Sequence, residues 1–111
     1  MNGLLDGLPK SIRLGPFDIA LIVKDKISED DDAGIYHNGI SIELREDQFN
    51  AMFAVDTVLH EISHGLYRAA GLDKKSSEEN IVTAMATGWT QVFRDNPALL
   101  TWLYQMIPPA P

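Results

Sequence analysis

The spacing of apolar residues changes near the middle of this 111-residue chain. Before residue 47, apolar and polar residues alternate, most clearly at Ile40, Ile42 and Leu44, which is the pattern of a strand with one buried face. Beyond that point, apolar residues recur every three or four positions, as they do on an amphipathic helix. The sequence therefore predicts an α+β fold, with a small N-terminal antiparallel β-sheet followed by helices.

Two regions carry the strand pattern. The first, residues 12–23, is interrupted by a Gly-Pro pair, so it forms either one bent strand or two short ones. Because residues 17–23 are apolar at nearly every position, we expect burial on both faces there. The second region, residues 34–44, has a turn or bulge at Gly39. Residues 24–32 between them indicate a solvated acidic loop, since the glycine and ligand spacing of an EF-hand calcium site is missing.

Three helices are predicted after the sheet. The first spans residues 48–70, with Asp47 as its N-cap and Gly71 as its stop. The second spans residues 78–95 and ends before a proline, which cannot continue a helix. A short third helix covers residues 98–107. Gly65 and Gly88, one on each long helix, are expected to permit close helix approach.

Composition and charge limit the possible functions. The length suits one domain over residues 1–111, with flexible ends at 1–10 and 108–111. Sixteen Asp and Glu against nine Lys and Arg give a net charge of −7, which disfavours binding to nucleic acid or to an anionic membrane. We see neither a membrane-spanning apolar run nor a signal peptide, so we expect a cytoplasmic protein. Because cysteine is absent, any metal must be held by His, Asp or Glu.

The most informative motif is H-E-x-x-H, formed by His60, Glu61 and His64 within the first predicted helix. Residues four apart lie on one helix face, so His60 and His64 can bind one metal ion. Glu61 lies about 100° around the helix from His60, where it can reach a metal-bound water without ligating the metal. Zinc lowers the pKa of such a water toward about 7, and a neighbouring carboxylate can take its proton. The motif thus predicts a metallopeptidase with Glu61 as catalytic base.

The motif also fits two alternatives to a zinc site. The histidines can be ordinary helix residues and Glu61 a solvated side chain, although shuffled sequences of this composition contain the pattern in only on the order of one case in several hundred. Other divalent metals also suit two imidazoles and one carboxylate.

A catalytic zinc ion takes three protein ligands and one water, so a third side chain is needed. Glu78 and Glu79 open the second predicted helix, after a glycine-containing turn that lets the two helices fold back together. Glu79 shares the expected packing face with Val82, whereas Glu78 lies to one side, so Glu79 is favoured. The alternative is a capping box between Ser76 and Glu79, which would leave Glu78 as the ligand.

The H-E-x-x-H helix followed by a helix that opens with glutamate resembles the gluzincin metallopeptidases. In particular, residues 34–97 are similar to the small ImmA/IrrE-like enzymes and to compact zinc peptidase-like proteins of phages and prophages. Val82 and Met85 follow Glu79 at positions that are small or apolar in those enzymes, although position 82 is usually Ala in them.

The resemblance implies a minimal zincin-like fold, Zn²⁺ as cofactor, a peptide or protein substrate and, for a phage-encoded protein, a bacterial host cell. It also implies that the strand at residues 40–44 forms the sheet edge beside the cleft and binds an extended peptide. Candidates for oxyanion stabilisation, by residue type, are Tyr36, His37, Tyr67 and Arg68. Asp56 or Asp73 could hold the second imidazole nitrogen of His60.

Three functional hypotheses follow. The first is a zinc-dependent metallopeptidase. The second is a non-catalytic, zinc-stabilised protein of phage or prophage origin that acts through protein-protein interaction. The third is a metal-free interaction module in which the motif is a coincidence.

Overall fold

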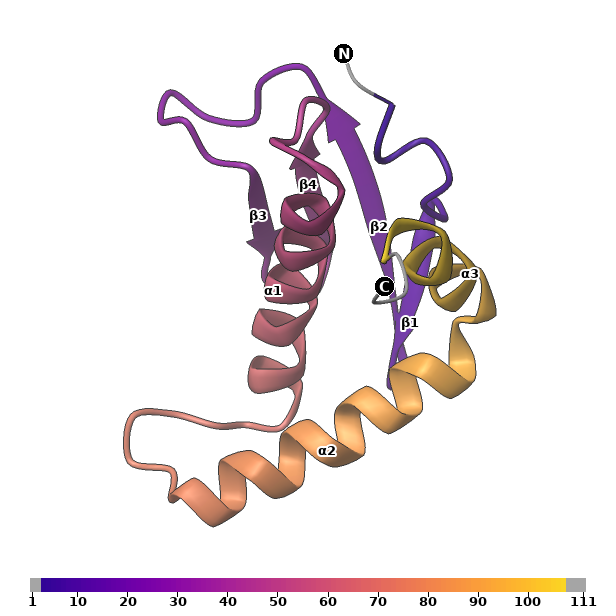
Figure 1. The fold of residues 1–111 in the computed structure, drawn as a ribbon. Helices are drawn as coiled ribbons and strands as arrows, with labels where there is room; N and C mark the ends of the chain where they lie inside the picture. The colour runs from indigo at the N-terminus through magenta and orange to yellow at the C-terminus, as the bar shows by residue number, and fades with distance from the viewer. Residues whose placement is uncertain (1–2, 108–111) are drawn as a thin grey trace.

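The computed structural model describes residues 3–107, which form a four-stranded sheet followed by three helices (Figure 1). The strands are β1 (Ser11–Leu14), β2 (Phe17–Lys24), β3 (Gly34–His37) and β4 (Ser41–Arg45). The helices are α1 (Ala51–Ala69), α2 (Glu78–Asp95) and α3 (Pro97–Met106). The predicted α+β class is confirmed, as are the bounds of the second helix and the turns within both strand regions.

The sheet has the strand order β1-β2-β4-β3 and is mixed, so the predicted antiparallel sheet is wrong. β1 pairs antiparallel with β2, and β3 with β4, but β2 and β4 run parallel. Ile42 and Leu44 of β4 are 1% and 0% exposed, so the more apolar strand of the hairpin occupies the centre of the sheet. The loop of residues 25–33 carries the chain past β4, and β3, rather than residues 40–44, becomes the edge.

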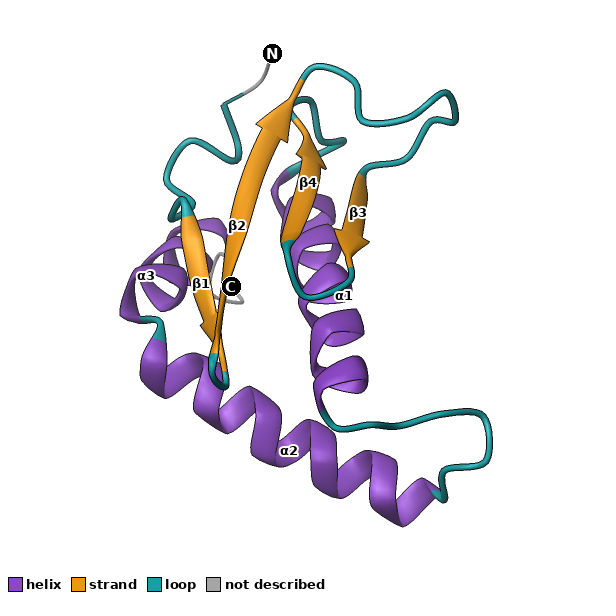
Figure 2. Ribbon diagram, turned by 180° about the vertical axis from the view of Figure 1, so that it is seen from behind, coloured by secondary structure: helices purple, strands orange, loops and turns teal. Residues whose placement is uncertain are grey.

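α1 and α3 cover one face of the sheet, and no helix of the described chain covers the other face (Figure 2). Side chains of β2 therefore alternate, with Ile19 and Leu21 buried and Ile22 exposed. The predicted burial of residues 17–23 on both faces is wrong because only one face is covered.

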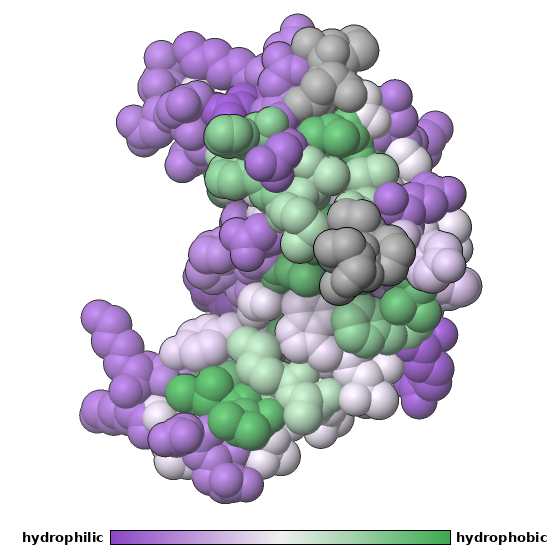
Figure 3. All heavy atoms as spheres, viewed as in Figure 1, coloured by the Kyte–Doolittle hydropathy of each residue, from purple (hydrophilic) through white to green (hydrophobic). Residues whose placement is uncertain are grey.

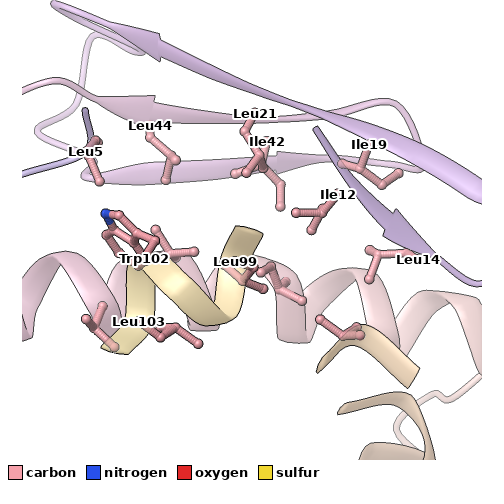
Figure 4. Close-up of a cluster of buried hydrophobic side chains, with 14 of the residues drawn as sticks. Leu5, Ile12, Leu14, Ile19, Leu21, Ile42, Leu44, Leu99, Trp102 and Leu103 are labelled. Carbon is pink, nitrogen blue, oxygen red and sulfur yellow. The ribbon is translucent and has the colours of Figure 1, made fainter. Parts of the chain in front are cut away.

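The core lies between the sheet and the helices. Apolar side chains of the sheet face the helices in Figure 4, with Ile12, Leu14, Ile19, Leu21, Ile42 and Leu44 on the sheet side and Leu99, Trp102 and Leu103 of α3 on the helix side. Trp102 is fully buried, and its indole N–H donates to the carbonyl oxygen of Leu4 at 3.0 Å. Of the residues predicted to form flexible ends, 1–10 and 108–111, Leu5 is 4% exposed and part of the core, and 1–2 and 108–111 lie outside the described residues. No helix in the described part of the chain has the length and hydrophobicity to cross a membrane.

α1 begins later than predicted, because Asn50 and not Asp47 is its N-cap. The Asn50 side chain accepts a hydrogen bond from the backbone N–H of Phe53 at 2.8 Å. Gln48 is buried, and its amide donates to the carbonyl oxygen of Ala33 at 3.1 Å. This long-range bond holds the chain outside helical geometry until Asn50.

α2 crosses the C-terminal end of α1 (Figure 1). The predicted stop at Gly71 is confirmed, since this residue has a φ of +68° and follows the C-cap of α1. A Cβ on Gly88 would lie 2.8 Å from Leu66 Cδ2, so the predicted close helix approach at Gly88 is confirmed. Val82 is exposed rather than packed, because the N-terminal half of α2 extends beyond α1.

Candidate metal site

α1 brings His60 and His64 together on its exposed side. Their Nε2 atoms are 3.1 Å apart, and the ring planes meet at 77°. Two imidazoles that share a tetrahedral zinc ion place their nitrogens about 3.3 Å apart, as Zn–N bonds of about 2.05 Å require. The pair therefore fits one shared ion. Gly65, next to His64, is predicted to permit close approach of another helix. In the structure it lets α1 approach the sheet instead, because a Cβ on Gly65 would lie 2.7 Å from Leu14 Cδ1.

Glu61 is 7% exposed and lies between α1 and β3. A Cβ on Gly34 would lie 3.0 Å from its Cγ, so the glycine makes room for this side chain. The Glu61 carboxylate makes no hydrogen bond or ion pair with any described residue. Most of the residue is buried, but the carboxylate oxygens open into the cleft, so they can accept hydrogen bonds from water or from a bound substrate.

These three side chains share a cleft of about 670 Å³ between α1, β3 and the loop before α2. Its lining consists of Asp32, Gly34, Ile35, Tyr36, His60, Glu61, His64, Tyr67, Arg68, Leu72, Asp73 and Lys74. The left edge of the molecule in Figure 3 is hollowed between two hydrophilic lobes, which in Figure 1 are the loop after β2 and the loop before α2. The cleft runs beside the edge strand β3 and is open to solvent.

The structure does not bring a third ligand to the two histidines. Among residues 3–107, no three His, Asp or Glu side chains gather closely enough to hold a metal ion. Glu78 and Glu79 both lie exposed in the first turn of α2. The Glu79 carboxylate accepts a hydrogen bond from the Thr83 hydroxyl at 3.4 Å, one turn along the same helix.

The alternative capping box between Ser76 and Glu79 is wrong. Ser77 is the N-cap of α2, and its hydroxyl accepts from the backbone N–H of Asn80 at 3.1 Å. The Ser76 hydroxyl instead accepts from the backbone N–H of Asp73 at 2.9 Å, within the loop before α2. Glu79 therefore has no capping role.

The face of α2 nearest the histidines carries Met85, which lines a smaller pocket with His60 and His64. Glu78 lies seven residues before Met85, so it is on the same helix face but about 10 Å further along the axis. Glu79 points about 120° away from that face. Because of this helix crossing, Glu78 rather than Glu79 shares the face of α2 nearest the histidines, which is the opposite of the prediction from periodicity.

Of the predicted oxyanion stabilisers, Tyr67 is the best placed. It is half-buried, lines both pockets next to the histidines, and its hydroxyl has no partner among the described residues. Tyr36 lines the cleft, but its hydroxyl accepts from the backbone N–H of Gly39 at 2.7 Å. Arg68 also lines the cleft.

Two predicted residues stand apart from the cleft. His37 lies on the uncovered face of the sheet, where its Nε2 pairs with Glu43 at 2.8 Å. Asp56 is exposed and bonds to no described residue, so it does not hold the second nitrogen of His60 here. The cleft instead contains Asp73, the other candidate, and Asp32, which sequence reasoning missed because a solvated acidic loop gives no signal of its position.

Comparison of the chain with models of known families, with curated proteins and with solved structures finds no match in any of the three. Function therefore has to be inferred from the site itself.

Proposed function

We propose that this chain is a zinc-dependent, metallopeptidase-like hydrolase with a minimal zincin-like fold. The observation that carries the proposal is the carboxylate of Glu61, which bonds to no described residue and opens into the cleft beside two imidazoles whose Nε2 atoms are 3.1 Å apart. A cleft with a free strand edge beside this acid favours an extended peptide as substrate.

His60 and His64 would hold the ion through Nε2, and Glu79 or Glu78 would complete the protein ligands. Zinc, when bound, supplies Lewis acidity that acidifies a water and polarises the scissile carbonyl. Glu61 takes the proton from the attacking water and passes it to the leaving amine. The Tyr67 hydroxyl, which bonds to no other described residue, donates to the oxygen on which negative charge develops.

The edge strand β3 would orient the substrate. Arg45 N donates to Ala33 O at 2.9 Å, so by the alternation of an antiparallel ladder the odd residues of β3 bond to β4. The backbone groups of Gly34 and Tyr36 then point to the free edge, and both residues line the cleft. A peptide added at this edge lies alongside Glu61.

The test combines metal analysis with peptide hydrolysis. His60→Ala should abolish stoichiometric zinc, whereas His37→Ala, which removes the third histidine from the opposite sheet face, should retain it. Glu61→Gln should retain zinc and abolish hydrolysis. Zinc-dependent cleavage by Glu61→Gln at the wild-type rate would exclude this mechanism, and Glu78→Gln against Glu79→Gln identifies the third ligand.

A non-catalytic, zinc-stabilised phage or prophage protein is the second candidate. It is favoured by the distance of both α2 glutamates from the histidines, and by apolar side chains exposed at the start of α1, Phe49, Met52 and Phe53. In this case a chelator lowers the melting temperature, while Glu61→Gln leaves partner binding intact. A chelator that changes neither stability nor activity would instead leave the metal-free interaction module.

A further inference from the structure

The cations of this acidic chain are distributed unevenly. Ion pairs with described residues engage five of the nine Lys and Arg side chains, namely Arg13, Lys24, Lys26, Arg45 and Arg94. The other four, Lys10, Arg68, Lys74 and Lys75, have no such partner. Three of these four fall within residues 68–75, between the end of the motif and the start of α2. Unpaired positive charge is therefore concentrated in one place.

That place is one end of the cleft. Arg68 and Lys74 both line it, and Arg68 also lines the adjoining pocket with Tyr36 and Gly39. Asp73 is the one acid in this stretch, and its Oδ1 accepts from the backbone N–H of Lys75 at 2.8 Å. Arg68 lies one helical turn beyond His64, so its charge is within a side chain's reach of the candidate reaction centre.

The opposite end of the cleft is acidic. Asp32 lines it and belongs to the run of four acids at residues 29–32. Glu29 and Asp31 in this run pair with Lys26 and Arg45, which leaves the charges of Asp30 and Asp32 without a described cation. β3 connects the two ends, since Gly34 contacts Glu61 while Tyr36 contacts Gly65, further along α1. The strand thus runs from the acidic lobe toward the basic one, and both lobes flank the hollow in Figure 3.

We propose that the cleft selects extended peptides of matching charge polarity, with an acidic side chain against Arg68 and Lys74 and a basic one against Asp32. The proposal rests on the proposed function and names its substrate class. Antiparallel pairing with β3 places the N-terminal part of the peptide at Arg68, so the acidic residues precede the basic ones in the substrate. At about 3.4 Å per residue, four residues between the charges span the strand.

The test uses two synthetic octapeptides of identical composition and blocked termini. One has two glutamates, four small or apolar residues and two lysines, and the other has the two charged pairs exchanged. Their equal net charge removes any effect of the protein's overall charge. Binding is measured by fluorescence anisotropy on zinc-loaded Glu61→Gln protein, which separates recognition from turnover. The acid-first peptide should bind about fivefold more tightly at low salt, and 0.5 M NaCl should remove the difference.

Lys74→Glu should abolish this preference, while Lys10→Glu, an identical charge change outside the cleft lining, should preserve it. Equal or reversed affinity for the two peptides, absence of binding to either, or equal effects of the two substitutions would overturn the proposal. Failure of the proposed function gives a different result: the wild type does not cleave a peptide that the Glu61→Gln protein binds selectively.

Discussion

Replacing Asn96 should test how the corner between α2 and α3 is held to the sheet. Its side chain is 8% exposed and makes three hydrogen bonds. The Oδ1 atom accepts from the backbone N–H of Arg13 at 2.6 Å, and Nδ2 donates to the carbonyl oxygens of Arg13 at 2.9 Å and Val92 at 2.8 Å. The two bonds to Arg13 join residues 83 positions apart, so they fix the end of α2 relative to β1.

The expected cost follows from this geometry. At about 0.5–1.5 kcal/mol for each bond, Asn96→Ala should lower the free energy of unfolding by about 2–4 kcal/mol, since the N–H of Arg13 loses its acceptor. Asn50→Ala, which removes one exposed cap bond to Phe53, should cost about 1 kcal/mol and serves as the matched control. Each kcal/mol corresponds to a fall in melting temperature of about 4–8 °C in a domain of this size.

Urea unfolding followed by circular dichroism, with a chelator present so that metal does not contribute, measures both variants. The m-value should not change, because the same surface is exposed on unfolding. If Asn96→Ala costs no more than Asn50→Ala, the three bonds do not determine the position of α2.

Three further predictions concern the site and the sheet. Gly34→Ala should reduce hydrolysis at least about tenfold while zinc content changes little, because the new Cβ would lie 3.0 Å from Glu61 Cγ and displace that side chain; steady-state kinetics on zinc-loaded protein measure this. The same Cβ would lie 3.0 Å from Thr57 Cγ2 and 3.3 Å from Leu44 Cδ2, so the melting temperature should fall as well. Zinc at about 100 times its Kd should stabilise the wild type by about 2.7 kcal/mol in a thermal melt and leave His64→Ala unchanged. The hydrogen bond from Lys24, with a smaller contribution from His37, lowers the pKa of Glu43 below 4.5. The stability contributed by Glu43 is therefore present above pH 4.5 and is lost as the pH falls through the lowered pKa. Glu43→Gln should accordingly weaken the pH dependence of urea unfolding below about pH 4.5.

Sequence reasoning succeeds here where the determinant is local. The i, i+4 spacing of His60 and His64 fixes their neighbourhood in any helix, and the structure brings their Nε2 atoms together. Gly71 and the proline at position 97 end helices through their own backbone properties, so the predicted breaks are confirmed. The alternation of apolar residues likewise predicts the strands, because it needs only a covered face.

It fails where distant segments compete. Asp47 and Asn50 are equally good N-caps by residue type, and the long-range bond from Gln48 to Ala33 decides between them. The strand order is decided in the same way, since the hairpin can present either strand to β2 and the more apolar β4 is chosen. Neither the N-cap of α1 nor the strand order can be recognised from the local spacing of apolar residues.

The third metal ligand is the most consequential of these long-range questions. Periodicity favours Glu79 only if α2 packs against α1 along its whole length, whereas the two helices meet near Gly88 and Leu66. Met85 is therefore the α2 residue beside the histidines, and the helix extends its first turn away from them. Glu78 shares the face of Met85, so tilting α2 about the Gly88 contact would bring Glu78 toward the ion sooner than Glu79. Metal analysis of the two glutamate variants thus also reports on the helix crossing.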